Sequence, residues 1–412
     1  MVEKEAIIPP DWAWSTLGNS CDIVLGQSPP SDTYNLEGIG LPFYQGKSEF
    51  SDLYPIPVKW CSKPQKLAKP NDVLISVRAP VGPTNLCKED SCIGRGLAAI
   101  HPRNSMPSKY FMYYLRLIEK EWDTKATGTT FKAITGTVLR NQRIPLAPLT
   151  EQERIVERIE SLFTQLDAGI TGLKRAKAAL KRYKASVLKA ACEGRLGNYN
   201  MGQDSHIPNN WAWTTLGELK QHLTSGSRGW AKYYSDSGSL FIRVGNFERL
   251  SKSIYLEKSV FVNAPQGAEA DRTRLKLKDI LITMTADVGM VGVVDERTLR
   301  GGGAYINQHV GLVRIRETNY VDFIAYALAS EVGQTQFRKK QYGLTKVGLN
   351  FDDIKSIRIP LPPLEQQRRI VVEVDQRLSV VQELEQTIEA NLKRAERLRQ
   401  AILKRAFEGK LT

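Results

Sequence analysis

The chain has 412 residues, of which 58 are lysine or arginine and 44 are aspartate or glutamate, so its formal net charge is +14. With 42% hydrophobic and 8% aromatic residues, it is long and apolar enough for two or three cores, at roughly 150 residues for each domain. These values exclude a single small domain and a mostly disordered chain.

The surplus of positive charge favours an anionic partner, with nucleic acid as the leading candidate and an anionic membrane surface or an acidic protein as alternatives. The five cysteines form no Cys-x-x-Cys pair. The first residues lack the cationic and then apolar pattern of a signal peptide, and no apolar run approaches the ~20 residues of a membrane span. We therefore expect a cytoplasmic protein with no disulfide framework and no membrane among its partners.

Comparison of the chain with itself reveals an internal repeat. The matching segments are 9–18 (PPDWAWSTLG) with 208–217 (PNNWAWTTLG), 72–76 with 279–283, 143–149 with 358–364, and 193–196 with 408–411. The offset grows from 199 to 207 and then to 215, so the second half is the longer one. The shared segments also include the long helices that follow, because the offset stays at 215 through them, whereas the halves differ in length and sequence elsewhere, for example in 26–50 against 226–250. This pattern indicates that the shared segments bind two copies of one partner, whereas each variable segment recognises something different.

Each half begins with a globular segment. Residues 72–77 and 279–284 are short apolar runs rich in β-branched residues, which predicts buried strands. Residues 110–121 and 320–336 predict short helices. Glycine and proline punctuate the remainder, which predicts long loops between these elements.

A long amphipathic helix follows each globular segment. Apolar residues recur at three- and four-residue steps from 150 to 194 and again from 371 to 402, near the period of a coiled coil. Prolines precede each helix, and Gly194 or Gly409 follows it. About 45 residues at 1.5 Å each make a rod of roughly 65 Å, and two matched rods in one chain are expected to pack together.

The predicted fold class is α+β, with two globular α/β domains separated by two long antiparallel helices that form a coiled coil with a pseudo-twofold repeat. The predicted boundaries are 1–149 for the first domain, 150–196 for the first helix, 197–363 for the second domain and 364–412 for the second helix. The C-terminal part of each helix is strongly basic, with seven cations and no acid in residues 174–189. This charge is either ordinary helix surface or a contact for phosphates or an acidic partner.

The motifs of a catalytic protein are missing. The four histidines are scattered, and no histidine or cysteine spacing matches a zinc site. Residues 40–48 resemble a phosphate-binding loop, but five residues separate their glycines where that loop has four. The chain also lacks a dinucleotide fingerprint, a nucleophile elbow and a methyltransferase motif. The sequence therefore predicts a binding protein with no catalytic, cofactor-binding or metal-binding residues of its own.

The shared segments resemble the specificity subunit of a type I restriction–modification enzyme. The resemblance rests on the Trp-x-Trp-x-x-Leu-Gly motifs that begin at Trp12 and Trp211, on GLTKVGLNF at 343–351 followed by IPLPPLEQQ at 359–367, and on the helix-ending 193–196 and 408–411. It covers essentially the whole chain. The first half departs from the pattern at Ala147, where the second half has a proline, and in residues 128–134.

The resemblance implies a non-catalytic specificity subunit. Each globular segment would be a target recognition domain that reads one half of a split, asymmetric DNA sequence, and the helices would set the gap between the halves. The implied partners are double-stranded DNA, two methyltransferase subunits and restriction subunits. The implied cofactors, S-adenosylmethionine, ATP and Mg, would belong to those partner subunits.

Base readout favours Arg, Lys, Asn and Gln on exposed loops, and phosphate contacts favour Lys, Arg and Ser. The predicted DNA-binding residues, each with ordinary surface charge as the alternative, are Gln45, Lys47, Arg78 and Arg95 in the first half and Arg228, Lys232, Arg243, Asn246 and Lys346 in the second. Tyr44, Trp230 and Tyr233 are candidates for stacking on an unstacked base, although packing within the protein is the favoured role. The repeated tryptophans Trp12, Trp14, Trp211 and Trp213 are expected to pack in the core.

Two other classes of function compete with DNA recognition. The first is a coiled-coil scaffold that binds acidic protein or membrane surfaces without reading a sequence, which two unlike domains on a repeated scaffold fit poorly. The second is an enzyme in its own right, which the missing motifs disfavour.

Overall fold

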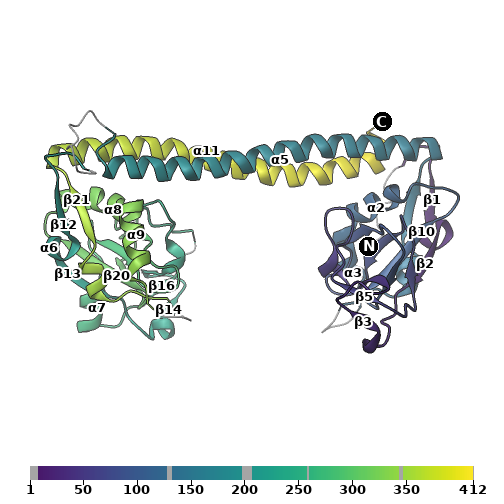
Figure 1. The fold of residues 1–412 in the computed structure, drawn as a ribbon, viewed down its shortest axis with the longest axis horizontal. Helices are drawn as coiled ribbons and strands as arrows, with labels where there is room; N and C mark the ends of the chain where they lie inside the picture. The colour runs from purple at the N-terminus through teal and green to yellow at the C-terminus, as the bar shows by residue number, and fades with distance from the viewer. Residues whose placement is uncertain (1–7, 128–131, 197–206, 258, 343–346, 412) are drawn as a thin grey trace. The chain divides into compact units, whose positions relative to one another are not determined.

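The computed structural model describes residues 8–127, 132–196, 207–257, 259–342 and 347–411. The chain forms two compact units, one made of Met1–Leu173 with Ala390–Thr412 and the other of Lys174–Glu389. Each unit contains one globular domain and a stretch of both long helices (Figure 1). No helix within the described ranges is long and apolar enough to cross a membrane.

The long helices α5 (Leu149–Cys192) and α11 (Leu364–Phe407) have 44 residues each. In the first unit the start of α5 shares a core with the end of α11, and Asp167 pairs with Arg399. In the second unit the end of α5 packs with the start of α11. The helices are therefore antiparallel within each unit, as predicted.

Ion pairs between the helices use part of the basic charge that the sequence places on α5. In the second unit Lys177 lies 2.8 Å from Glu389, and Lys184 lies 3.2 Å from Glu385. These lysines are neutralised by carboxylates of α11, so they are not free cations for an external partner.

Each long helix is followed by a glycine in the left-handed region, with φ of +69° at Gly194 and +66° at Gly409. A Cβ atom at Gly194 would lie 2.3 Å from Pro208, and one at Gly409 would lie 2.2 Å from Pro9. Each helix therefore ends in close contact with the segment that opens a globular domain, and only glycine fits there.

The first globular domain contains two sheets, of strand order β2-β10-β7-β8 and β3-β5-β4-β9-β6, together with the β1–β11 pair. Its strands and helices are β1 (Ala13–Thr16), α1 (Leu17–Ser20), β2 (Cys21–Leu25), β3 (Tyr34–Asn35), β4 (Leu41–Tyr44), β5 (Lys59–Cys61), β6 (Leu67–Ala68), β7 (Val73–Ser76), β8 (Thr84–Leu86), β9 (Ser91–Ile93), β10 (Leu97–Pro102), α2 (Ser108–Leu117), α3 (Trp122–Lys125), α4 (Gly136–Arg140) and β11 (Arg143–Leu146).

The second domain repeats this topology, with sheets of order β13-β20-β17-β18 and β14-β16-β15-β19 and the pair β12–β21. Its elements are β12 (Ala212–Thr215), α6 (Leu216–Leu219), β13 (Lys220–Ser225), β14 (Tyr234–Ser235), β15 (Ser239–Ile242), β16 (Phe261–Val262), α7 (Ala268–Thr273), β17 (Ile280–Thr283), β18 (Val291–Val293), β19 (Ala304–Ile306), β20 (Val310–Ile315), α8 (Val321–Ala329), α9 (Glu331–Lys340), α10 (Phe351–Lys355) and β21 (Arg358–Leu361).

The predicted strands at 72–77 and 279–284 are β7 and β17, and every residue in both is buried. The helix predicted at 110–121 is α2, which ends four residues early. The single helix predicted at 320–336 is wrong, because the chain forms α8 and α9 with a break at Ser330. Ser330 has extended backbone angles, and its hydroxyl accepts a hydrogen bond from the N–H of Val332, which starts a new helix.

The first tryptophan of each repeated motif joins a domain to a long helix. The indole N–H of Trp12 donates to Glu151 Oε2 at 3.1 Å on α5, and that of Trp211 donates to Gln366 Oε1 at 2.8 Å on α11. Both rings are buried, as predicted.

The prediction of core packing is wrong for the second tryptophan of each motif. Trp14 is half-buried and Trp213 is 43% exposed. Each ring is covered by an arginine of the partner strand, Arg143 over Trp14 at 4.6 Å and Arg358 over Trp213 at 5.2 Å. The physical reason is the position of each tryptophan relative to the strand. Residues two positions apart share a face of a strand only when both lie within it. Trp12 and Trp211 lie just before β1 and β12, whereas Trp14 and Trp213 lie within them.

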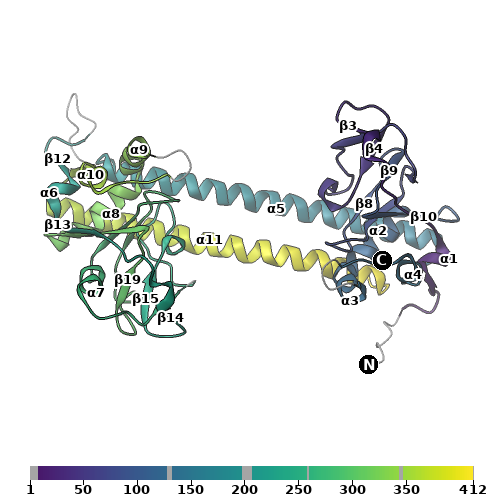
Figure 2. The same cartoon turned by 90° about the horizontal axis from the view of Figure 1, so that it is seen from below.

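A polar network also fixes the second domain to α11, against which α8 packs (Figures 1 and 2). The Tyr326 hydroxyl donates to Asp375 of α11. Lys252 lies 3.1 Å from Asp375 and 2.9 Å from Asp322 of α8, and Lys278 also pairs with Asp322 at 2.5 Å. The first domain has a simpler contact, in which Lys109 of α2 pairs with Glu160 of α5.

Candidate nucleic-acid interface

A cavity of about 340 Å³ opens in the first domain between the loops that follow β2, β4, β7 and β9. All four residues predicted to bind DNA in this half line it, and all four are exposed: Gln45, Lys47, Arg78 and Arg95. Three of them are cations, and no acidic residue is among the lining residues. Residues 50 positions apart in the sequence thus form one basic site, which suits the phosphates and acceptor-rich base edges of DNA.

Strand pairing explains why these loops meet. β4 and β9 run parallel, with Tyr44 opposite Ile93, so the residues that follow both strands emerge together. The loop after β7 joins them through a hydrogen bond from the Val77 N–H to the Gly96 carbonyl at 2.9 Å. The loop after β2 is close as well, because the Arg95 N–H donates to Ser28 Oγ at 3.4 Å.

In the second domain the predicted residues differ in how far they are exposed. Arg228 and Lys232 are exposed, and Arg243 is half-buried directly after β15. Asn246 is 2% exposed; its Oδ1 accepts from the Arg243 N–H at 2.9 Å and its Nδ2 donates to the Tyr255 carbonyl at 2.8 Å. In this arrangement Asn246 holds a turn of the chain and has no face open to DNA.

Lys346 lies outside the described residues. Its assignment to DNA binding therefore stays a prediction from the sequence. The same holds for the DNA contacts of the other predicted residues, whose positions the structure provides without a nucleic acid.

The aromatic candidates pack within the protein. Tyr44 is 1% exposed and Trp230 is 3% exposed. Burial raises the pKa of Tyr44 to about 12. Trp230 stacks on Phe241 with ring centres 5.9 Å apart, and Tyr233 meets it edge-on at 6.2 Å. Packing, the role that the sequence favoured, is confirmed for Tyr44 and Trp230.

Sequence reasoning missed three polar residues of the second domain, Thr285, Gln308 and His309, because no local sequence pattern marks the loops that carry them. The Oγ1 of Thr285 lies 2.5 Å from His309 Nδ1, and the Nε2 of Gln308 lies 3.0 Å from His309 Nε2. They occupy the loops after β17 and β19, which match the Arg78 and Arg95 loops of the first domain. Alignment of the repeated strands, rather than charge, is the signal that finds them.

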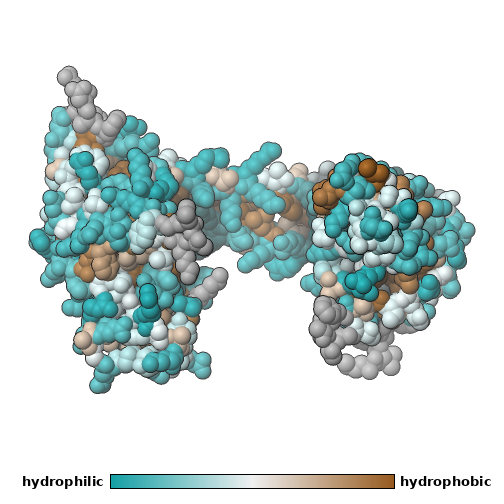
Figure 3. Space-filling view, turned by 60° about the horizontal axis from the view of Figure 1, so that its bottom comes forward, coloured by the Kyte–Doolittle hydropathy of each residue, from teal (hydrophilic) through white to brown (hydrophobic). Residues whose placement is uncertain are grey.

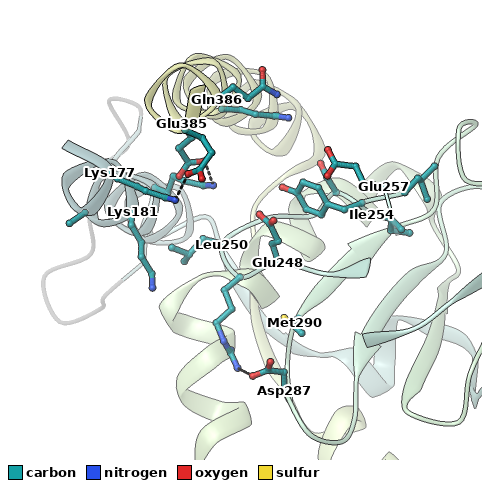
Figure 4. Close-up of a pocket in the computed structure, with 18 of the residues that line it drawn as sticks. Lys177, Lys181, Glu248, Leu250, Ile254, Glu257, Asp287, Met290, Glu385 and Gln386 are labelled. Carbon is teal, nitrogen blue, oxygen red and sulfur yellow. Dashed lines mark hydrogen bonds and ion pairs between the residues drawn. The ribbon is translucent and has the colours of Figure 1, made fainter. Parts of the chain in front are cut away.

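A second cavity, of about 1270 Å³, lies in the second unit between the two long helices and residues 248–257 of the domain. Figure 4 shows Lys177 of α5 beside Glu385 of α11, Lys181 of α5 pointing away from Glu385, and Glu248 and Glu257 on the domain side. Cations and carboxylates are nearly balanced in its lining, and several already pair with one another. This balance makes it a poorer site for a polyanion than the basic cavity of the first domain.

The surface has no extensive apolar face in the view of Figure 3. Hydrophilic residues cover most of the visible side of each globular domain, and hydrophobic residues form small separate groups. Such a surface suits a polar, charged partner better than an apolar one.

A family model described as the type I restriction modification DNA specificity domain matches residues 9–175 and 245–394. Over 192 residues the chain is 41% identical to a Methanocaldococcus jannaschii protein named as the MjaX type I restriction enzyme specificity subunit, across 46% of this chain and 44% of that protein. It is 26% identical over 373 residues to the EcoBI specificity subunit of Escherichia coli, across 83% of this chain and 74% of that one.

A solved structure from work on complex assembly and conformational transition of the type I R-M system has the same fold. Its TM-score is 0.71 at 22% sequence identity, and the match covers 98% of this chain and 99% of that chain. The likeness spans both globular domains and both long helices.

Proposed function

Because this chain belongs to the family of type I restriction–modification DNA specificity subunits, we propose that it binds a split, asymmetric DNA target, one half to each globular domain. Its relatives are named as specificity subunits, so its role is recognition and not catalysis. The observation that carries the proposal is that two domains of one topology present matching loops with different side chains, one set of which forms a basic cavity.

The first domain would contact DNA through its basic cavity. Arg78 and Arg95 have the planar donor geometry that suits a guanine edge, and Lys47 suits a phosphate. Gln45 adds an amide that can donate and accept. In the second domain Arg228, Lys232 and Arg243 are the exposed or half-buried cations of the predicted set.

The repeated contacts between each domain and its long helix support docking of two copies of one partner. Trp12 with Glu151 and Trp211 with Gln366 give both units the same local scaffold. We propose that two methyltransferase subunits bind these repeated surfaces and that restriction subunits join through them. S-adenosylmethionine, ATP and Mg would belong to those subunits.

Co-expression of the chain with the methyltransferase subunit of its own system tests the proposal. The complex is confirmed by gel filtration, and methylated adenines are then mapped across the host genome. An interrupted motif with two unrelated halves is the expected result. A stable complex that methylates no defined motif would contradict sequence recognition, and the absence of a complex would contradict the docking of methyltransferase subunits.

A further inference from the structure

The repeated topology gives each domain the same four loops, and their residues can be matched by counting from the strand ends. Ser28 and Arg228 are the third residues after β2 and β13, respectively. Gln45 and Arg243 are the first residues after β4 and β15, respectively. Position 78 or 285 is second after β7 or β17, and position 95 or 308 is second after β9 or β19.

A repeated hydrogen bond supports this matching. The Val77 N–H donates to the Gly96 carbonyl at 2.9 Å in the first domain, and the Met284 N–H donates to the His309 carbonyl at 2.8 Å in the second. The last two loops are therefore adjacent in both domains, whatever side chains they carry.

The two domains place their arginines on opposite pairs of loops. Read in loop order, the four positions are Ser28, Gln45, Arg78 and Arg95 in the first domain and Arg228, Arg243, Thr285 and Gln308 in the second. Each domain thus has two arginines and two neutral hydrogen-bonding residues, in exchanged places. The adjacent last two loops carry two cations in one domain and none in the other.

In the second domain these neutral residues form a chain of contacts. The Gln308 amide donates to His309 Nε2 at 3.0 Å, so the other ring nitrogen, Nδ1, carries the proton that it shares with Thr285 Oγ1. The second amide hydrogen of Gln308 and its Oε1 have no partner among the contacts of the described residues. One donor and one acceptor are what an adenine edge requires, from N6 and N7, whereas arginine suits the two acceptors of guanine.

We propose that Gln308 reads an adenine edge in the second half-site, with His309 and Thr285 as positioning residues, and that Arg78 and Arg95 read a guanine edge in the first. This inference rests on the proposed function, because it assumes that both domains bind DNA. It goes beyond that function by assigning a different base class to each domain from the exchanged arrangement of the loops.

The test uses the full chain in complex with its methyltransferase subunit and synthetic duplexes that carry the mapped target. Each adenine of the second half-site is replaced in turn by 7-deazaadenine, which lacks the N7 acceptor. For the wild-type complex one replacement is expected to weaken binding on the order of 10-fold. For Gln308→Ala the unmodified target should bind on the order of 10- to 100-fold more weakly, and the same replacement should add no further loss.

Two variants separate readout from folding. Gln308→Glu keeps the shape of the side chain and should move the preference at that position from adenine toward cytosine, because a carboxylate accepts from cytosine N4. Gln221→Ala, at an exposed position on β13 of the same domain, is the matched control and should leave binding unchanged. Arg95→Gln should alter only the first half-site, with loss of its response to 7-deazaguanine.

The outcomes distinguish a failure of the proposed function from a failure of the assignment of Gln308. If the wild-type complex selects no sequence, the proposed function fails and the inference fails with it. If it selects a split target but no 7-deazaadenine replacement affects binding, or the same replacement weakens wild type and Gln308→Ala equally, the assignment of Gln308 is overturned while the proposed function stands.

Discussion

Lys252 has in the second unit the role that Lys109 has in the first, since each neutralises a carboxylate of the long helix against which its domain packs. The two carboxylates, Glu160 and Asp375, are separated by the same offset of 215 that relates the repeated helix starts. Asp375 also accepts a hydrogen bond from the hydroxyl of a domain tyrosine, Tyr326. The domain helices differ, because α2 supplies the lysine in the first unit, whereas α8 carries the acidic Asp322. In the second unit Lys252 supplies the cation instead and pairs with both Asp322 and Asp375.

Lys252→Ala should therefore destabilise the second unit. The substitution leaves Asp375 without its cation, and the pair is only partly exposed, so we expect a loss of about 1–2 kcal/mol, between the values for surface and buried pairs. For a unit of this size that corresponds to a fall in Tm of roughly 2–8 °C. Thermal unfolding followed by circular dichroism measures it.

The double variant Lys252→Ala/Asp375→Asn supplies the control. An amide oxygen at position 375 still accepts from Tyr326 without a charge that needs neutralising, so part of the lost Tm should return. Lys276→Ala, at an exposed position nearby, should change the Tm little. An equal loss for Lys252→Ala and Lys276→Ala would show that the bridge contributes no stability.

The same network predicts a dependence on pH. Burial alone would raise the pKa of Asp322, but hydrogen bonds and charge from Lys278 and Lys252 outweigh it and hold the pKa below the usual value. A carboxylate with a depressed pKa stabilises the fold above its unfolded pKa of about 4, and this contribution is lost as the pH falls through the folded pKa. The difference in unfolding free energy between wild type and Lys252→Ala should accordingly shrink below about pH 4, as urea titrations at stepped pH would reveal. A constant difference down to about pH 3 would contradict the assignment.

The pair Trp12 and Glu151 offers a test that the repeat itself controls. Glu151→Ala removes the acceptor of a buried indole N–H, which should cost about 1–2 kcal/mol of unfolding free energy. Glu151→Gln restores the side chain found at the matching position 366 and should cost under about 0.5 kcal/mol. Chemical denaturation of both variants decides, and equal losses would mean that the carboxylate charge matters more than the hydrogen bond.

Exchange of residues 20–140 for the corresponding segment of another specificity subunit should change one half of the target and leave the other half intact. The exchanged segment includes the whole basic cavity of the first domain but neither long helix. Methylation mapping of the chimaera, with the parent chain as reference, is the measurement. A change in both halves would show that the domains do not read DNA independently.

Lys346→Ala should weaken DNA binding and flatten its salt dependence, as expected for a cation that contacts a phosphate. Loss of one such contact lowers the slope of log affinity against log salt by about one. Titrations at several salt concentrations measure this slope. A slope equal to that of the wild-type chain would remove Lys346 from the interface.

The architecture could be predicted from the sequence because the repeated segments coincide with the parts that make structural contacts. Trp12, Trp211 and the two long apolar stripes lie in the shared segments, and they fix which helix each domain joins. The break at Ser330 was missed because apolar residues continue across it, while a hydroxyl decides where the new helix begins. The capping hydrogen bond of Ser330 therefore set the helix boundary, although the apolar periodicity predicted one continuous helix.

The site was only partly predictable, for two physical reasons. The meeting of Gln45, Arg78 and Arg95 depends on the parallel pairing of β4 with β9, which no local pattern reveals. A search for cations and amides also selects by type and not by environment. It therefore included the buried Asn246, which supports a turn. Gln308, an amide that is half-buried on a matching loop, was not selected because nothing in the local sequence marks that loop.

The contacts at Gly194 and Gly409 have a topological consequence. The first long helix ends against Pro208, which opens the second domain, and the second long helix ends against Pro9, which opens the first. The end of the second half thus contacts the start of the first half, and each half is joined to the other by the same kind of glycine–proline contact. A circular permutant that joins residue 412 to residue 1 and opens the chain between residues 196 and 207 would exchange the order of the halves while keeping every contact described here.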